Sequence, residues 1–242
     1  MTSPSASTAA TPPLPEGCTD VVDVVSDVVC PWCYIGKRHL DALINSLPAS
    51  DQVLVRWHPY QLNPIMPPEG EDRQEYLEEK FGSRERAAKI YERVSAAGRE
   101  AGLELAFDRI TRMPNTALAH RLLSWAQESQ GPSGVSSHTL AEALFSAYFT
   151  QGRNVGDREV LLELVGQAGG NPADAQSWLE HEGGMDTLKE WARKARAFGI
   201  NGVPFFIFNQ KLAVSGAQPV TVLKDVLTQS REARESAAAR SA

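Results

Sequence analysis

Two cysteines separated by two residues, in the segment Cys30-Pro31-Trp32-Cys33, have the spacing in this chain that is best suited to chemistry. Thiols so placed on the first turn of a helix can reach each other and form a disulfide. A redox-active pair is therefore the favoured interpretation. Two alternatives stay open, which are half of a zinc site in need of two further ligands and a pair of ordinary helix cysteines.

The flanking residues place the pair at the start of a helix. Residues 19–29 read TDVVDVVSDVV, which predicts a buried strand, and residues 32–47 carry apolar side chains at helical spacing. Pro31 suits the first helical position because an N–H there has no intrahelical partner. The positive end of the helix dipole favours a thiolate at this place. Cys30 is thus expected to attack a disulfide, and Cys33 to resolve the mixed disulfide.

The rest of the chain predicts one sheet built from both of its ends. Residues 51–60 predict a second strand, and residues 203–208 predict a third strand that begins with a proline. Residues 211–214 are expected to pair with the third strand as a hairpin, and residues 219–227 to form a closing helix. This order of elements indicates a mixed α/β layer with helices on its faces.

A long helical pattern separates the second and third strands. Helix N-caps are expected at Asn115, Asp157 and Asn171, the last followed by Pro172 at the first helical position. Glycine and proline predict breaks between helices, at residues 82, 113–115, 131–134, 152, 169–172 and 183–184. The predicted organisation is a disordered tail (1–17), a discontinuous domain (18–70 and 199–230), a helical insertion (71–198) and a second tail (231–242).

Composition and charge limit the partners and the compartment. A net charge of −6 and a pI near 5.4 argue against nucleic acid or an anionic membrane surface as the main partner. Neither a secretory signal nor a run approaching the roughly 18 apolar residues of a membrane span is visible, so a cytoplasmic protein is expected. Cys18 is expected to be a small buried or semi-exposed hydrophobic residue outside the pair, with an intermolecular disulfide as the alternative.

Several motifs in this order resemble the DsbA-like thioredoxin-fold family, and within it the FrnE-type branch related to 2-hydroxychromene-2-carboxylate isomerases. They are SDVVCPWCYIGKR and GINGVPFFIFNQKLAVSGAQP, with QLNP at 61–64, MPNT at 113–116 and LFSAYFTQGRNVGD at 144–157 between them. The resemblance covers about residues 18–228 and implies an α/β, thioredoxin-like fold. In that fold a large all-helical insertion lies between the second and third strands.

The resemblance also implies a substrate-binding element. It places a cis peptide bond between Val203 and Pro204 beside the cysteine pair, although such bonds are only about 5–6% of X–Pro bonds in folded proteins. The backbone of Val203 would then pair with an extended substrate segment, and Pro204 would keep metal away from the thiolates. No cofactor beyond the Cys30–Cys33 disulfide is implied, and glutathione is a candidate co-substrate.

Other residues receive weaker expectations. Asp27, three residues before Cys30, either assists proton transfer from Cys33 or holds the turn between strand and helix. Trp32 is expected to be exposed and either to tune the redox potential or, with Pro31, to contact substrate. Residues 216–219 are expected to turn near the active face. Structural roles are expected for three further side chains, those of Trp57, His58 and His120.

The predicted function is a thiol–disulfide oxidoreductase acting on protein or small-molecule disulfides or thiols through a mixed disulfide. The first alternative is a glutathione-dependent isomerase or transferase of the kappa or chromene-carboxylate type, whose members carry serine at the position of Cys30. The second is a redox-sensing binding or chaperone module in which the insertion holds a partner. The sequence leaves open the reduction potential, the physiological substrate and the oligomeric state.

Overall fold

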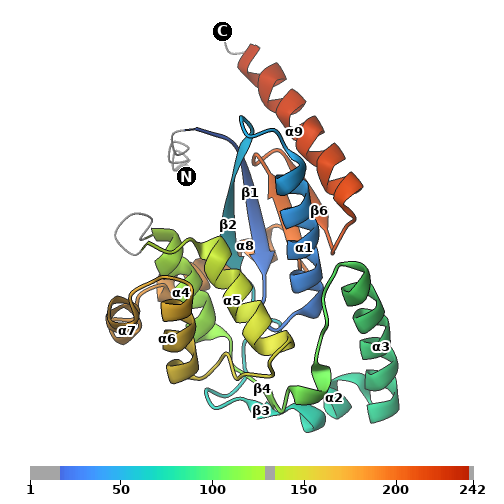
Figure 1. Ribbon diagram of the computed structural model, residues 1–242, viewed down its shortest axis with the longest axis vertical. Coiled ribbons are helices and arrows are strands. Elements are labelled where there is room, and N and C mark those ends of the chain that lie inside the picture. The colour runs from blue at the N-terminus through green and yellow to red at the C-terminus, as the bar shows by residue number, and fades with distance from the viewer. Residues whose placement is uncertain (1–16, 129–133, 240–242) are drawn as a thin grey trace, which may run out of the picture.

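The computed structural model describes residues 17–128 and 134–239, and a four-stranded sheet lies at its centre (Figure 1). In the order β2-β1-β5-β6, its strands are β2 (Gln52–Pro59), β1 (Cys18–Ser26), β5 (Phe205–Phe208) and β6 (Leu212–Ser215). Strand β1 runs parallel to β2 and antiparallel to β5, and β5 is antiparallel to β6. The two ends of the chain therefore meet in one sheet, as the sequence predicts.

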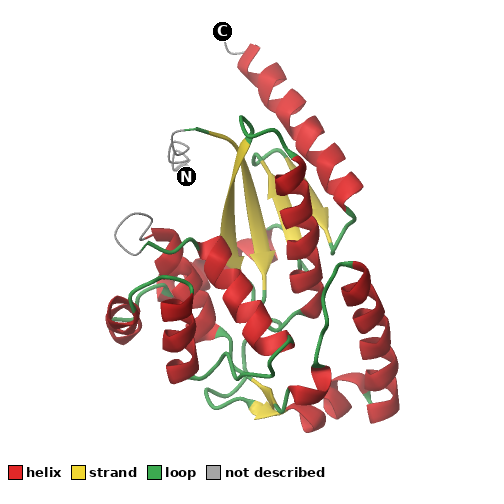
Figure 2. Ribbon diagram, in the orientation of Figure 1, coloured by secondary structure: helices red, strands yellow, loops and turns green. Residues whose placement is uncertain are grey.

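Both faces of the sheet are covered by helices, which explains the unbroken β-branched run of β1. Val22 and Val24 pack in the large core that includes α1 (Pro31–Ser46), whereas Val25 packs with Ala195 of α8 (Met185–Ala197). Figure 2 shows α1 in front of the sheet and α8 behind it. Because successive side chains of a strand point to opposite faces, β1 is buried along both sides.

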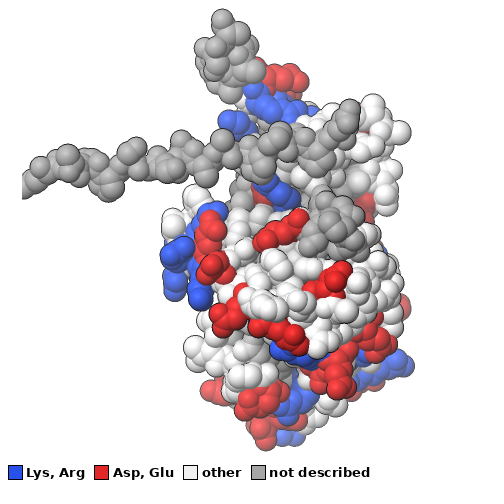
Figure 3. All heavy atoms as spheres, turned by 90° about the vertical axis from the view of Figure 1, so that its left-hand side faces the viewer, with Lys and Arg blue, Asp and Glu red and all other residues white. Residues whose placement is uncertain are grey.

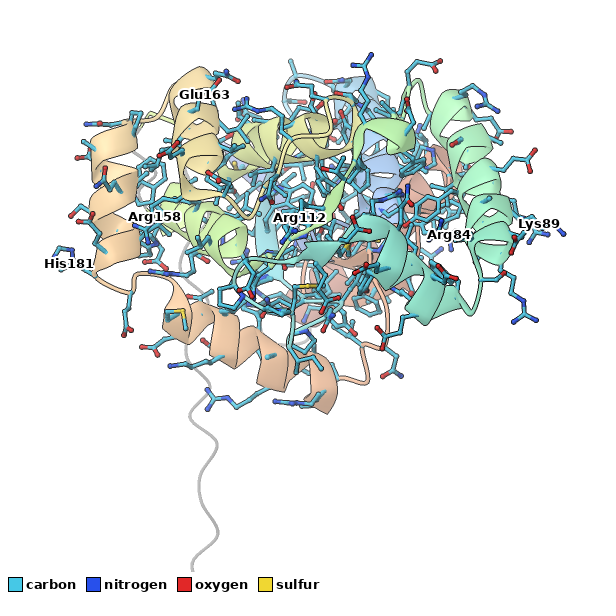
Figure 4. The ribbon with its side chains drawn as sticks, turned by 90° about the horizontal axis from the view of Figure 1, so that it is seen from below. Arg84, Lys89, Arg112, Arg158, Glu163 and His181 are labelled. Atoms are coloured by element: carbon cyan, nitrogen blue, oxygen red, sulfur yellow. The ribbon has the colours of Figure 1, made fainter. Side chains whose placement is uncertain are left out.

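The insertion is helical, as predicted. Its helices are α2 (Arg73–Phe81), α3 (Arg84–Glu100), α4 (Ala117–Glu128), α5 (Ser137–Phe149), α6 (Arg158–Gln167), α7 (Pro172–Glu180) and α8, with a 3₁₀ turn at Phe107–Arg109. One addition was not predicted, an antiparallel pair of two-residue strands, β3 (Glu71–Asp72) and β4 (Arg112–Met113). Arg112 lies near the middle of the view from below, while Arg84, Lys89, Arg158, Glu163 and His181 lie toward the sides (Figure 4).

The N-caps follow the sequence prediction with one shift. The side chains of Asp157 and Asn171 cap α6 and α7, and Pro172 is the first residue of α7. Asn115 accepts a hydrogen bond from the backbone N–H of Ala117, but α4 begins at Ala117, so Asn115 lies one residue before the capping position. The break expected at residues 131–134 falls largely outside the described residues.

The insertion packs on α1, the helix that begins after Cys30. The ring of Tyr34 stacks on Phe145 of α5 with centroids 5.2 Å apart, and its hydroxyl donates to Glu142 at 2.8 Å. Burial and the Glu142 carboxylate raise the pKa of Tyr34 to about 12. Lys37, only 3% exposed, forms ion pairs with Glu142 at 2.9 Å and with Asp41 at 2.8 Å. These contacts fix the orientation of α1 from the side of the insertion.

The last helix, α9 (Val220–Ala239), extends beyond residue 230 and is joined to the start of β1. The Asp20 carboxylate is fully buried and accepts hydrogen bonds from Arg231 at 2.6 and 2.9 Å and from Asn209 at 2.8 Å. Burial alone would raise the pKa of Asp20, but these hydrogen bonds outweigh it and hold the pKa below its ordinary value. No helix in the described part of the chain is long and apolar enough to cross a membrane.

We predict that Arg231→Ala lowers the free energy of unfolding by about 1–3 kcal/mol, because it leaves a buried carboxylate with fewer donors. Since the pKa of Asp20 is lowered by folding, its stabilising contribution is present above the unfolded pKa, about 3.9, and is lost as the pH falls through the folded pKa. The stabilities of wild type and variant from urea denaturation should thus differ at pH 7, and the difference should begin to shrink below about pH 4.

Arg84→Ala is the matched control, because Arg84 pairs with Glu78 on the surface, where both side chains are at least half exposed. It should leave the unfolding midpoint unchanged. A difference between wild type and Arg231→Ala that does not vary with pH would contradict the assignment to Asp20.

Candidate active site

Cys30 lies at the junction of β1 and α1, where the sequence places it. It is the N-cap residue of α1, with an extended backbone at φ −93° and ψ 112°, and Pro31 is the first helical residue. The N–H of Cys30 donates to the carbonyl oxygen of Asp27 at 3.0 Å, and the Cys30 carbonyl accepts from the N–H of Cys33 at 3.0 Å. The sulfur of Cys30 is thus held at the positive end of a sixteen-residue helix.

Val203 and Pro204 reach this site from 173 residues further along the chain. The thiol of Cys30 donates to the carbonyl oxygen of Val203 at 3.5 Å, and the Val203–Pro204 peptide bond is cis. Gly36 permits this approach, because a Cβ at that position would lie 3.0 Å from the Pro204 ring and 3.0 Å from Phe206. Glycine inside a helix is unfavourable by itself, so a close contact of this kind explains its presence.

The loop expected near the active face contacts Pro204 directly. The N–H of Gly216 donates to the Pro204 carbonyl oxygen at 2.8 Å, with φ of +84° at Gly216, a conformation that favours glycine. In the same loop, the carbonyl oxygen of Gln218 lies 2.9 Å from Nδ1 of His39 on α1. Residues 216–219 therefore connect the proline to the helix that carries the cysteines.

The two cysteines have different surroundings. Cys33 is 1% exposed, and both thiols are free. Burial and the neighbouring Cys30 raise the pKa of Cys33 well above its ordinary value, while the Ser26 hydroxyl and the backbone at Asp27 act in the opposite direction. The resting form of Cys33 is thus the neutral thiol. Cys30 therefore lies at the helix terminus, and the protonated Cys33 lies within the first turn of the helix.

Asp27 lies beneath the cysteine pair as a buried carboxylate, 1% exposed. Its Oδ2 accepts from the N–H of Leu62 at 2.8 Å, and its Oδ1 lies 3.2 Å from Nε2 of His120 on α4. The carboxylate therefore joins the turn before Cys30 to the loop after β2 and to the insertion. These contacts favour the expectation that Asp27 holds the turn.

The remaining candidates separate into those near the pair and those away from it. Trp32 is 40% exposed beside Cys30, as expected from the sequence. His58 faces the other side of the sheet, where Nε2 lies 2.6 Å from Asp23 and the ring stacks on Trp191 of α8. Trp57 contacts His138 of α5 instead. In the described residues, no group of three or more His, Cys, Asp or Glu side chains is placed to hold a metal ion.

The sequence did not predict three parts of the candidate site. They are Gly36, the backbone of Leu62 and the pairing of His120 with Asp27. His120 follows Asp27 by 93 residues, and no local pattern connects the two. Gly36 did carry a signal, since a glycine among strong helix formers three residues after Cys33 marks a close approach.

We predict that iodoacetamide at pH 7 alkylates Cys30 at least about threefold faster than Cys33, because each unit of raised pKa lowers the thiolate fraction tenfold and greater nucleophilicity offsets only part of that loss. Mass spectrometry of peptides from a Cys18→Ser background measures both rates. Labelling in urea is the control, in which the two cysteines should react alike. Equal rates in the folded protein would contradict the difference in surroundings.

We also predict that Asp27→Ala lowers the free energy of unfolding by about 1–3 kcal/mol, since it leaves the Leu62 N–H and the His120 ring unpaired. Asp27→Asn keeps an oxygen for Leu62 and should cost less. Chemical denaturation measures both variants, and thiol-exchange rates are compared in parallel. A folded Asp27→Asn protein with a severe loss of exchange rate would instead favour proton transfer by Asp27.

Comparison with known proteins agrees with this geometry. The crystal structure of a probable DsbA oxidoreductase from Streptomyces coelicolor is similar at 30% identity and a TM-score of 0.76, covering 88% of this chain and 90% of that one. The cytosolic disulfide reductase DsbM from Pseudomonas aeruginosa, solved with GSH, shares the fold at 18% identity and a TM-score of 0.58, with 89% and 98% covered.

A 2-hydroxychromene-2-carboxylate isomerase also shares the fold, at 16% identity and a TM-score of 0.58, with 90% of this chain and 98% of that chain covered. The sequence profile of the DSBA-like thioredoxin domain matches residues 21–228. Both the predicted resemblance and the predicted fold, thioredoxin-like with a helical insertion, are thereby confirmed. The chain belongs to the family of DSBA-like thioredoxin domains.

Proposed function

We propose that this protein is a thiol–disulfide oxidoreductase in which Cys30 is the nucleophile and Cys33 the resolving thiol. The observation that carries the proposal is the position of Cys30, at the N-terminus of α1 with its sulfur 3.5 Å from the Val203 carbonyl oxygen and a cis-proline next to it. Family membership supports oxidoreductase or related isomerase chemistry in general. The specific redox pair is our proposal.

The reaction proceeds by two exchanges that need no other oxidant or reductant. The sulfur of Cys30, at the N-terminus of α1, attacks a substrate disulfide as a thiolate, and one substrate sulfur leaves as a thiolate that takes up a proton. Cys33 then loses its proton and attacks the mixed disulfide at Cys30. The Cys30–Cys33 disulfide forms, the second substrate thiolate leaves, and the substrate has gained two electrons. The reverse sequence oxidises a dithiol.

Substrate binding is assigned to the surface around Cys30. The backbone of Val203 would pair with an extended substrate segment, while Pro31 and the exposed ring of Trp32 would contact it from the helix side. Pro204 shapes this surface through the hydrogen bond of its carbonyl oxygen with Gly216. Each of these roles is part of the proposal.

The proposed substrates are proteins or small molecules that carry a disulfide or thiols. Glutathione is a proposed co-substrate, and no resident cofactor is proposed. We propose a cytoplasmic location. We also propose that nucleic acid and membranes are not partners, since the net charge is −6. Acidic and basic side chains are interspersed on the face shown in Figure 3.

The relative stability of the thiolate and disulfide forms determines whether the protein oxidises or reduces its substrate. A redox titration of Cys30 and Cys33 in glutathione buffer would measure it.

We predict that Cys30→Ser lowers thiol-dependent reduction of a disulfide-containing test protein such as insulin by about a hundredfold or more, because it removes the nucleophile. Cys33→Ala should accumulate a mixed disulfide between Cys30 and substrate, detected by mass spectrometry under non-reducing conditions. Cys18→Ser is the matched control and should retain wild-type activity. Full activity in Cys30→Ser, or none in wild type, would refute the proposal.

The same variants discriminate the two alternatives. Glutathione binding with turnover unaffected by Cys33→Ala would favour a glutathione-dependent isomerase or transferase. Suppression of aggregation of a test protein that survives replacement of both Cys30 and Cys33 would favour a binding or chaperone module. The oxidoreductase proposal expects activity to require both cysteines.

A further inference from the structure

A buried hydroxyl without a hydrogen-bond partner lies at the end of β1. Ser26 is 4% exposed, and its Oγ makes no hydrogen bond within the described part of the chain. Buried polar atoms are nearly always paired, because an unpaired one costs free energy. A serine that follows two buried valines at alternate positions, Val22 and Val24, therefore requires an explanation.

The alternation of β1 directs Ser26 toward the helix that carries the cysteines. Val24 and Cys33 belong to one packed core, whereas Val25 packs on the opposite face beneath α8. Ser26 follows Val24 by two residues, so its side chain lies on the same face as Val24. The position of Ser26 is fixed by backbone pairing, since its carbonyl oxygen accepts from the N–H of Tyr60 at 3.0 Å.

The candidate partner of this hydroxyl is the sulfur of Cys33 in its charged form. Burial and Cys30 raise the pKa of Cys33, and a hydrogen bond from Ser26 to the thiolate lowers it. A thiol is a weak acceptor, whereas a thiolate is a strong one. In the described part of the chain the hydroxyl has no hydrogen-bond partner, and it is one of the groups that lower the pKa of Cys33.

We propose that the Ser26 hydroxyl is a catalytic hydrogen-bond donor to the Cys33 sulfur, engaged only while that sulfur carries negative charge. The inference rests on the proposed function of the cysteine pair and adds a group to it. An interaction that strengthens as charge develops accelerates the chemical step, whereas one that is equally strong beforehand does not.

The same donor serves both directions of exchange. When Cys33 resolves a mixed disulfide, its proton is released, its thiolate attacks Cys30, and the bond from Cys30 to the substrate breaks as the substrate thiolate departs and is protonated. In the reverse direction a substrate thiolate attacks Cys30, and Cys33 leaves with the electron pair before it is protonated. Ser26 stabilises the Cys33 thiolate in each case.

Dithiobis(nitrobenzoate), which releases a coloured thiolate at each exchange, separates the two steps. The first release reports the attack by Cys30 and leaves a mixed disulfide, and the second release reports the attack by Cys33 on that bond. Stopped-flow absorbance resolves both phases. All proteins carry Cys18→Ser, so that the third thiol does not react.

We expect Ser26→Ala to leave the rate of the first release unchanged and to slow the second. Each unit by which the pKa of Cys33 rises lowers its thiolate fraction tenfold, but a thiolate of higher pKa is also more nucleophilic. Together these effects slow the attack by Cys33 about threefold per unit. Loss of a charged hydrogen bond should thus slow the second release about three- to fifteenfold at pH 7 and move its pH profile to higher pH. Ser26→Thr keeps the hydroxyl and should restore the pH profile.

Ser137→Ala is the matched control, because the Ser137 hydroxyl in α5 is also buried and has no hydrogen-bond partner among the residues that the structure describes. Neither release should change in it. The ionisable groups around Cys33, namely Cys30 and the pair of Asp27 with His120, are present in every variant. A changed pH profile is therefore attributable to the hydroxyl.

An unchanged second release in Ser26→Ala, or an equal slowing of both releases, would overturn the role of Ser26. If Ser26→Ala does not fold by circular dichroism, Ser26→Gly removes the same oxygen and takes its place. These outcomes differ from those expected if the proposed function itself is wrong. In that case wild type would show no second release, or Cys30→Ser would retain the first.

Discussion

The antiparallel pairing of β1 with β5 is the interaction on which the site depends. It joins Val25 to Phe205 at its last paired position, one residue after Pro204 and five before Cys30. From there β1 continues into the turn that carries the cysteine, while the chain before β5 carries Val203. The 3.5 Å contact between the Cys30 sulfur and the Val203 carbonyl oxygen is the outcome of this register. A slip of one residue would invert both faces of β5 and remove the contact.

Much of the architecture follows from local patterns. The β-branched run of β1, Pro31 at the start of α1 and the capping residues Asp157 and Asn171 each act within a few residues, so the sequence predicts them well. Elements that depend on distant partners were missed. The strand pair β3–β4 has only two residues on each side, too few for an alternating pattern. The extension of α9 to Ala239 is supported at Arg231 by the buried Asp20.

The candidate site divides in the same way. Cys30 and Cys33 were found because their spacing is itself the signal, and Pro204 because a family resemblance supplied what composition could not. The pairing of Asp27 with His120 and the approach of Gly36 to Pro204 are tertiary contacts, over 93 and 168 residues, and no sequence pattern names the partner in either. The sequence also gives no sign of a role for Ser26. Its position relative to Cys33 becomes visible only when the two faces of β1 are known.

The distance along the chain between Cys30 and Val203 also bears on biosynthesis. Ribosomes add about 5–20 residues per second, so Val203 is made about 10–35 s after Cys30, which it follows by 173 residues. During that interval β1 and β2 are synthesised without β5, and the nascent chain carries Cys30 and Cys33 before the backbone of Val203 exists. Only the completed sheet places the Val203 carbonyl oxygen 3.5 Å from the Cys30 sulfur, so this half of the site forms late in synthesis.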